Sequence, residues 1–224
     1  IIFWSLTKIK GIADAGFTKI MTERAKTPFV SVHDFMVRMK GTGLGKDKTL
    51  SLVLAVCFDE CEGIKRPADR IRIVTEVFEF SKAPLTAQFT SGEIEKEHFW
   101  IMLQRDLTGF GDIDYPALIN KKNKVYTQYY TKAEEMPNVS QNKEVVVAGQ
   151  IDIIRPKNGK KGKFAEVRLR NNNGFIDVLL WTEAWTQYQK VCQEAYDAKS
   201  LICVRGTVKF DDYRGSNCVY SNDK

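Results

Sequence analysis

Long apolar stretches are missing from this sequence of 224 residues. No run approaches the roughly 20 consecutive apolar residues that a membrane-spanning helix needs, so we expect no membrane partner. The first residues, IIFWSL, have neither the charged start nor the small-residue cleavage site of a secretory signal peptide. The chain opens on Ile1 rather than methionine, and we therefore expect it to be part of a longer polypeptide.

Histidine and paired cysteines are equally scarce. The two histidines, His33 and His98, lie far apart in the sequence, and no nucleophile pattern accompanies them. The five cysteines form no CxxC pair, and no histidine lies near Cys57 and Cys61 to complete a zinc site. We interpret the cysteines as reduced thiols of a cytoplasmic protein.

A glycine loop for nucleotide phosphates is missing as well. The segment Gly41–Lys46 only superficially suggests a Walker-type loop, because the required spacing is absent. The adjacent carboxylates Asp211 and Asp212 fall in a predicted loop, which favours a solvated turn over a metal site. The sequence therefore predicts no catalytic residue, no bound metal and no cofactor in this chain.

Positive charge is present and concentrated. The formal net charge is +6, which suggests a polyanionic partner. Between Lys143 and Arg170, eight basic residues stand against three acidic ones, a local excess of five in 28 residues. This patch directs attention to the C-terminal part of the chain.

The first 131 residues show the spacing of short helices. Apolar residues recur at helical intervals from Ile12 to Met21, and Pro28 ends that segment. Ser31 followed by Asp34 predicts a capping box and a helix that ends near Gly41. Further helices are predicted over 50–58, 68–78 and 93–103.

Residues 132–142 have no periodicity and contain Pro137, which predicts a linker. Beyond it, apolar residues alternate, as in strands. Gly149 interrupts the first strand, where a bulge or bend is expected. The predicted order of three strands, a helix and two strands is that of an OB-fold barrel. The predicted fold is therefore α+β with two domains, an all-α region over 1–131 and a five-stranded β-barrel over 143–224.

The surface of such a barrel has the chemistry that single-stranded nucleic acid needs. OB-folds bind ligands across strands 2 and 3, between the loops that join strands 1–2 and 4–5. Cations there would hold phosphates, and aromatic rings would stack on unpaired bases. The candidate residues are Lys157, Lys160, Lys161, Lys163, Phe164, Arg168, Arg170, Phe175, Trp181, Tyr213 and Arg214.

A tight turn near the start of the chain is predicted to enter a helix. Backbone N–H groups at such a helix start can hold a phosphate without reading sequence, and neighbouring lysines would add positive charge. The candidate DNA-contacting residues in this segment are Lys8, Lys10, Gly11, Ala13, Gly16 and Lys19.

Together the two regions resemble the C-terminal part of C-family bacterial replicative DNA polymerases, the DNA polymerase III alpha subunits. The segment LTKIKGIADAGFTKIMTERAKTPFVSVHDFMVRM looks like the helix-hairpin-helix region of the family, and EKEHFWIMLQRDLTGFGDIDYPALI is similar to the segment before the OB domain. The most specific piece, VVVAGQIDIIRPKNGKKGKFAEVRLRNNNGFIDVLLW, looks like the OB-fold itself. The sequence departs from the family at Ala13, where the second hairpin glycine is usual, and at Gly16.

The resemblance implies a non-catalytic DNA-binding segment of a DNA-directed DNA polymerase. Its helix-hairpin-helix region would hold primer–template duplex, and its OB-fold would sit near the single-stranded template. Nucleotidyl transfer would depend on carboxylates of an upstream palm domain. The implied partners are DNA, the upstream catalytic domains and a sliding clamp, for which Gln88-Phe89 and Gln104 with Leu107 are faint contact candidates.

Three other hypotheses remain open from the residues alone. The chain could be an RNA-binding OB module such as the anticodon-binding domain of a tRNA synthetase. It could be a stand-alone enzyme such as a nuclease, which metal-dependent cleavage would reveal. It could also be a protein-interaction scaffold, whose binding would not weaken with salt as phosphate contacts do.

Overall fold

Two separate hydrophobic cores organise the computed structural model, which describes residues 5–221. The chain divides accordingly into two compact units, Ile1–Asp112 and Ile113–Lys224. Each unit is described by itself below. None of the described helices is long and apolar enough to cross a membrane.

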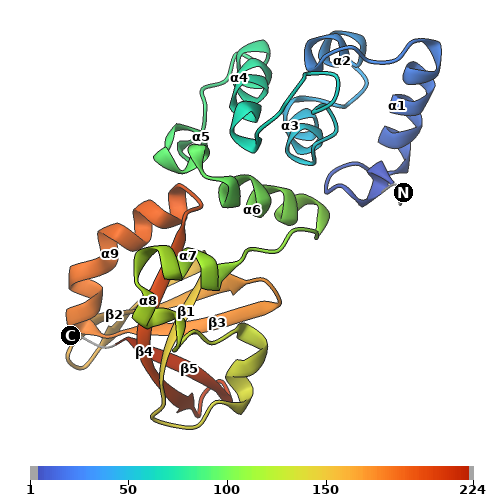
Figure 1. The fold of residues 1–224 in the computed structure, drawn as a ribbon. Helices are drawn as coiled ribbons and strands as arrows, with labels where there is room; N and C mark the ends of the chain where they lie inside the picture. The colour runs from blue at the N-terminus through green and yellow to red at the C-terminus, as the bar shows by residue number, and fades with distance from the viewer. Residues whose placement is uncertain (1–4, 222–224) are drawn as a thin grey trace. The chain divides into compact units, whose positions relative to one another are not determined.

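The first unit is helical throughout (Figure 1). Its α-helices and 3-10 helices (η) are η1 (Leu6–Lys8), α1 (Asp14–Lys26), α2 (Val32–Arg38), α3 (Lys46–Leu54), η2 (Pro67–Asp69), α4 (Arg70–Phe80), α5 (Ala87–Thr90), η3 (Gly92–Glu95) and α6 (Glu97–Thr108).

Local sequence signals set several of these helix ends. The hydroxyl of Ser31 accepts a hydrogen bond from the backbone N–H of Asp34 at 3.0 Å, so the predicted cap at the start of α2 is present. Gly109 ends α6 in the left-handed conformation that glycine adopts without strain. The helix predicted over 50–58 instead spans Lys46–Leu54, and Val56 has a φ of 63°, which is incompatible with a continuing helix.

The core of the first unit is rich in aromatic rings. Phe35, Phe89, Phe99 and Trp100 are almost completely buried, and each buried ring of this size contributes about 1.5–3 kcal/mol of apolar burial. The loop after α3 is fastened to α4 by a forked ion pair in which the Arg70 guanidinium donates to both carboxylate oxygens of Asp59.

The second unit is a closed five-stranded barrel preceded by short helices. Its elements are α7 (Tyr115–Lys122), α8 (Lys124–Thr127), η4 (Ala133–Asn138), β1 (Glu144–Gly159), β2 (Gly162–Asn171), β3 (Gly174–Leu180), α9 (Thr182–Asp197), β4 (Leu201–Asp211) and β5 (Ser216–Ser221). The strand order around the barrel is β1-β2-β3-β5-β4, with β4 pairing back onto β1. All strand pairs are antiparallel except β3 with β5.

The long strand β1 serves two neighbours. Its first half, to Gln150, pairs with β4, and its second half, from Gln150 onward, pairs with β2. The expected bulge falls between Ile151 and Ile153 rather than at Gly149. Gly149 instead permits close strand crossing, because a Cβ there would lie 2.5 Å from the backbone oxygen of Arg170.

The segment before the barrel belongs to the second unit. Asn172, in the turn between β2 and β3, accepts a hydrogen bond from the backbone N–H of Ile113 (3.0 Å) and donates one to its carbonyl (2.9 Å). Asn171 donates to the hydroxyl of Tyr130 at 3.1 Å. The chain therefore divides between Asp112 and Ile113, whereas the predicted linker over 132–142 lies within the second unit and contains η4, which buries Met136.

Candidate nucleic-acid interface

The predicted turn near the start of the chain is a hairpin between η1 and α1. Gly11 has a φ of 90°, which lets the chain reverse, and Ile9 and Ile12 anchor the hairpin in the core. Ala13 stands at the N-cap of α1 and offers no side-chain acceptor. Among residues 5–221, no side chain caps the first N–H groups of α1, and these groups can bind an external acceptor.

A second hairpin, which the sequence reading passed over, joins α2 to α3. Gly43 has a φ of 84°, Leu44 is buried, and Gly45 is an N-cap without a side chain. The first intrahelical bond of α3 is donated by Thr49 to the carbonyl of Gly45 at 3.0 Å, so the preceding N–H groups lack intrahelical acceptors. The sequence signal for this hairpin is the glycine-rich segment Gly41–Lys46, which resembles a Walker-type loop only superficially.

The fold brings the two hairpins together. A Cβ on Gly16 of α1 would lie 3.3 Å from the Leu44 side chain, so glycine permits the close packing of α1 against the second hairpin. Lys19 donates from Nζ to the carbonyl of Thr42 at 2.6 Å. Lys19 is thus engaged inside the unit, whereas Gly16 acts through packing.

The electrostatics of these two helix starts are mixed. Exposed N–H groups and the positive end of the helix dipole favour an anion, and Lys8 and Lys10 are exposed nearby in the sequence. However, Asp14 and Asp47 occupy the first turns of α1 and α3. The arrangement suits contact with a phosphate backbone at moderate strength more than tight capture of a single anion.

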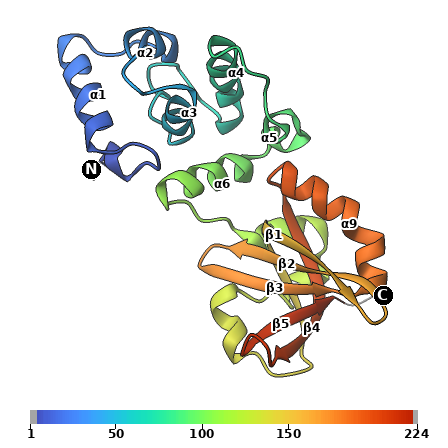
Figure 2. The same ribbon diagram turned by 180° about the vertical axis from the view of Figure 1, so that it is seen from behind.

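Two of the predicted arginines, Arg168 and Arg170, lie on β2, which runs between β1 and β3 in the barrel wall (Figure 2). Arg168 makes a forked ion pair with Asp177 on the neighbouring strand, with Nε–Oδ1 at 2.9 Å and Nη2–Oδ2 at 3.1 Å. These hydrogen bonds raise the pKa of the Arg168 guanidinium further above its usual value. Arg170 donates to Asp152 at 3.1 Å.

The loop between β4 and β5 closes over the same face. Arg214 pairs with Glu166 of β2, and its Nη1 lies 3.9 Å from Asp177 Oδ2 and 3.6 Å from Asp211 Oδ2. Its side chain is only 15% exposed. Lys157 of β1 also pairs with Glu166, so a carboxylate accompanies each of these cations.

The turn between β1 and β2 has a different character. Arg155, Lys160, Lys161 and Lys163 are all exposed, and they form no ion pair with any residue of the described range 5–221. Unpaired lysines on an exposed hairpin are suited to contact with phosphates.

The predicted aromatic residues divide into a cluster and separate platforms. Phe164 and Trp181 lie with ring centroids 5.2 Å apart, and Trp181 meets Tyr220 edge-on at 5.6 Å. Phe175 is 52% exposed and Tyr213 is 93% exposed. Phe210, which is also half exposed, was missed by the sequence reading.

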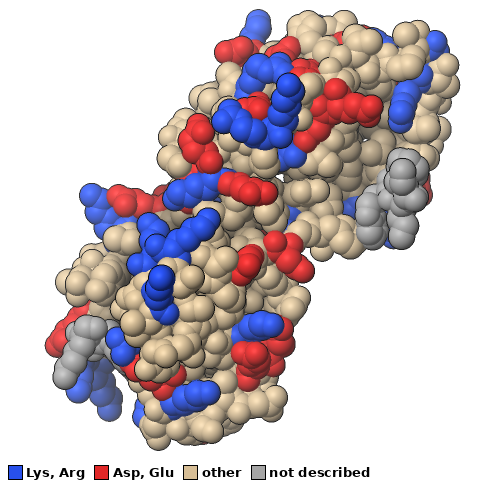
Figure 3. Space-filling view, in the orientation of Figure 1, with Lys and Arg blue, Asp and Glu red and all other residues tan. Residues whose placement is uncertain are grey.

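Further basic side chains lie outside both predicted sites. Lys121, Lys122 and Lys124 are exposed, and Figure 3 shows basic side chains gathered over α7 and α8. Elsewhere on the visible face, basic and acidic side chains are interspersed (Figure 3). On this face, the basic side chains over α7 and α8 therefore stand out as a local patch of positive charge.

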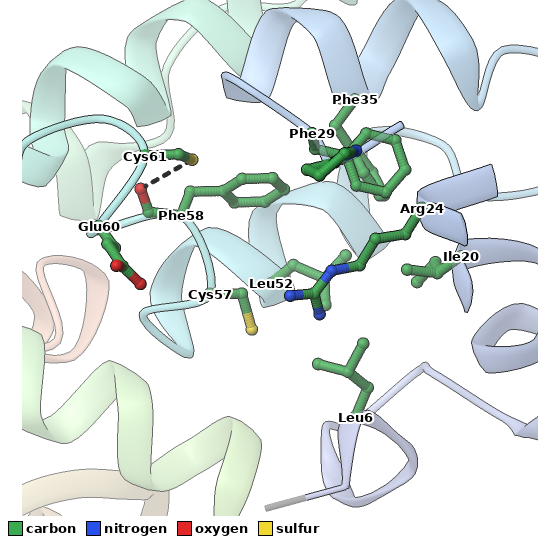
Figure 4. Close-up of a pocket in the computed structure, with 11 residues that line it drawn as sticks. Leu6, Ile20, Arg24, Phe29, Phe35, Leu52, Cys57, Phe58, Glu60 and Cys61 are labelled. Atoms are coloured by element: carbon green, nitrogen blue, oxygen red, sulfur yellow. Dashed lines mark hydrogen bonds between the residues drawn. The ribbon is translucent and has the colours of Figure 1, made fainter. Parts of the chain in front are cut away.

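A pocket in the helical unit has the wrong chemistry for phosphate. Figure 4 shows Phe29, Phe35 and Phe58 among its lining residues, with Leu6 below the Arg24 side chain. Among the residues lining this pocket, Arg24 is the one cation. The candidate interface therefore consists of the two hairpins and the barrel face.

Comparison with known proteins finds similarity to one motif profile and to DNA polymerases. A profile described as a helix-hairpin-helix motif matches residues 1–68, which include both hairpins. An error-prone DNA polymerase of Cutibacterium acnes is 25% identical over 217 residues, covering 92% of this chain and 18% of the relative. The DNA polymerase III subunit alpha of Aquifex aeolicus is 22% identical over 216 residues, covering 94% of this chain and 18% of the relative.

A structure of RecG bound to a three-way DNA junction aligns with 93% of this chain and 31% of its own, at a TM-score of 0.30 and 14% identity. This chain spans less than one fifth of the length of the polymerase relatives. The helix-hairpin-helix match and the two polymerase matches confirm the resemblance to C-family DNA polymerases, which extends over most of this chain.

Proposed function

We propose that this chain is a DNA-binding, non-catalytic segment of a C-family DNA polymerase. The helical unit holds primer–template duplex through its two hairpins, and the barrel binds the single-stranded template. The upstream catalytic domains supply nucleotidyl transfer, and a sliding clamp is a further partner. The observation that carries this proposal is the pairing of two glycine hairpins, each of which opens an uncapped helix.

Duplex binding by the hairpins follows from backbone chemistry. Gly11 and Gly43 both take positive φ values, and the buried residues Ile12 and Leu44 hold both hairpins against one core. N–H groups at a helix start contact phosphates without reading bases. Such contacts suit a polymerase segment, which must hold every sequence.

Single-strand binding by the barrel is supported by its topology and surface. Strand order β1-β2-β3-β5-β4 with a helix between β3 and β4 is the arrangement expected of an OB-fold. The free cations of the β1–β2 hairpin and the exposed rings of Phe175 and Tyr213 lie on the strands and loops that OB-folds use. These residues, with the others predicted from the sequence, form the proposed site.

A substitution at Gly45 tests the duplex proposal. Gly45→Asp places a carboxylate at the N-cap of α3, where a side chain meets no other atom within 4 Å. The carboxylate would cap the free N–H groups and repel a phosphate. We expect an unchanged or slightly higher melting temperature and about ten-fold weaker binding to primer–template duplex, measured by fluorescence anisotropy.

Gly92→Asp is the matched control, because it adds the same charge at another open glycine of the helical unit. Equal duplex affinity for wild type and Gly45→Asp would refute the hairpin proposal. A parallel competition between tRNA and single-stranded DNA tests the RNA-binding alternative. A clear preference for tRNA would replace the polymerase proposal for the barrel.

A further inference from the structure

On the barrel face, most basic side chains of the predicted site are paired with acidic side chains beside them. Four cations of β1, β2 and the β4–β5 loop contact four carboxylates: Lys157, Arg168, Arg170 and Arg214 pair with Asp152, Glu166, Asp177 and Asp211. A phosphate that took one of these arginines would have to break charge-assisted hydrogen bonds and then face the released carboxylate. This face therefore offers little attraction to a phosphate.

The same network holds a turn in place. Asp211 accepts a hydrogen bond from the backbone N–H of Tyr213 at 3.0 Å, and its carbonyl accepts one from Gly215 at 2.8 Å. Arg214 lies beneath the turn against Glu166 and Asp177. The largely buried Arg214 thus fixes the turn in which the preceding residue, Tyr213, is almost completely exposed.

A second ring is held in a similar way. Phe175 is half exposed, and the guanidinium carbons of Arg168 and Arg170 lie 5.7 Å and 5.8 Å from its ring centroid. Both arginines are fixed by carboxylates of neighbouring strands. The ring is therefore supported on one side by two anchored cations, while part of its surface is open.

The three unpaired lysines, Lys160, Lys161 and Lys163, lie at the hairpin end of β2, whereas Arg155 of β1 stands opposite Glu166 within the ladder. Phe175 pairs with Arg170, near the β2–β3 turn, whereas Lys163 pairs with Asn158, beside the β1–β2 hairpin. At about 3.3 Å per residue, Arg170 and Lys163 are roughly 23 Å apart along β2. The ring of Phe175 and the hairpin lysines are thus separated along β2.

We propose that the phosphates and the bases of a bound single strand contact different residues of the barrel. The hairpin cations Lys160, Lys161 and Lys163 hold the phosphates. Arg168, Arg170 and Arg214 are positioning residues that present Phe175 and Tyr213 to unpaired bases. The inference rests on the proposed single-strand binding by the barrel and specifies which residues contact which part of the nucleotide.

Salt dependence separates phosphate contacts from positioning. The variant Arg168→Gln/Asp177→Asn removes a charge pair without changing the net charge, and Lys160→Ala/Lys161→Ala/Lys163→Ala removes three hairpin cations. Each variant, as the full chain, is titrated with oligothymidine across a salt series. For the lysine variant we expect the slope of log affinity against log salt to fall by about 2 in magnitude. The slope of the charge-pair variant stays that of wild type.

Base stacking is tested with an abasic strand of equal length, which has the same phosphates but no bases. Phe175→Ala and Tyr213→Ala are each expected to weaken oligothymidine binding by about ten-fold and to leave abasic-strand binding unchanged. Melting temperatures check that all variants are folded. Arg214→Ala should weaken oligothymidine binding with an unchanged salt slope, and Arg214→Lys should restore part of the affinity.

The outcomes distinguish the two proposals. If the wild-type chain binds oligothymidine but the charge-pair variant loses slope, Arg168 is a phosphate contact and the division is wrong, while single-strand binding stands. Equal losses on abasic and thymidine strands would likewise refute stacking at Phe175 and Tyr213. If the wild-type chain binds no single strand at low salt, both proposals for the barrel are wrong.

Discussion

Arg168 on β2 and Asp177 on β3 face each other across the barrel surface and share two hydrogen bonds, of 2.9 Å and 3.1 Å. Their register makes them directly opposed residues on neighbouring strands. The sequence alone predicts Arg168 as a cation that is available to phosphate. In the fold its guanidinium is already paired with the carboxylate of Asp177.

Removal of that counter-ion should increase nucleic-acid binding. In Asp177→Asn, Arg168 and Arg214 lose a carboxylate that both contact. We expect tighter and more salt-dependent binding of oligothymidine, together with a loss of about 1 kcal/mol in the free energy of unfolding. Asp212→Asn in the exposed turn is the control, since it removes the same charge without releasing an arginine. Identical affinities for Asp177→Asn and Asp212→Asn would contradict the prediction.

A substitution at Gly149 should destabilise the barrel. A Cβ at this position would lie 2.5 Å from the oxygen and 3.0 Å from the carbon of the Arg170 carbonyl, which are backbone atoms that cannot rotate away. We expect Gly149→Ala to lower the free energy of unfolding of the second unit by about 3 kcal/mol. Urea denaturation followed by tryptophan fluorescence measures this loss. Gly45→Ala, in open space, should have a far smaller effect, and equal losses would refute the packing argument.

Asn172 should control the order of the segment before the barrel. Asn172→Ala leaves both backbone groups of Ile113 without their side-chain partner. The Ile113 carbonyl keeps the hydrogen bond from the Tyr115 N–H, but the Ile113 N–H loses its acceptor. An unsatisfied buried backbone group costs about 1–3 kcal/mol, so residues 113–122 should exchange amide hydrogens faster, while β1 and β2 remain protected. Hydrogen exchange with mass spectrometry detects this difference. Asn173→Ala, whose side chain contacts Glu134 at 3.3 Å, is the milder comparison.

Tyr130 should titrate at unusually high pH. Burial raises the pKa of its hydroxyl to about 12 from the ordinary value of 10.0, against a smaller opposing effect of the hydrogen bond from Asn171. Because the folded pKa is the higher one, the contribution of neutral Tyr130 to stability is complete below about pH 10. It is lost as the pH rises through about 12.

Absorbance of tyrosinate across an alkaline titration measures this shift. Tyr130→Phe should lack one late-titrating tyrosine and should show a weaker dependence of unfolding on pH between about 10 and 12. An unchanged late phase in Tyr130→Phe would assign the shift to another tyrosine.

Several elements of this fold could be read from local sequence. The alternation of apolar residues predicted β2 and β3 within a few residues, because one face of each strand is buried in the barrel. Ser31 and Asp34 predicted the start of α2, since a capping bond involves only residues three apart. The resemblance to C-family polymerases was likewise carried by contiguous segments and is confirmed by the comparisons.

The candidate site was predictable in its residue types but not in its electrostatics. The sequence identified Arg168, Arg170 and Arg214 as outward cations, and all three lie on the barrel face. Their counter-ions could not be assigned, because Asp152 is 18 residues from Arg170, and Glu166 lies on β2 whereas Arg214 lies in the β4–β5 loop. The specific roles of these residues in DNA binding remain predictions.

Tertiary structure also decided where the units divide and where the hairpins lie. Absence of periodicity predicted a linker over 132–142, yet Asn171 and Asn172 fasten the preceding residues to the β2–β3 turn. The packing of Gly16 against Leu44 brought together two turns that are separate in the chain. Periodicity and capping depend on residues within one turn or strand, and they can therefore be predicted from the sequence. Ion pairing, strand crossing and unit boundaries depend on which distant segments meet, and only the folded chain determines that.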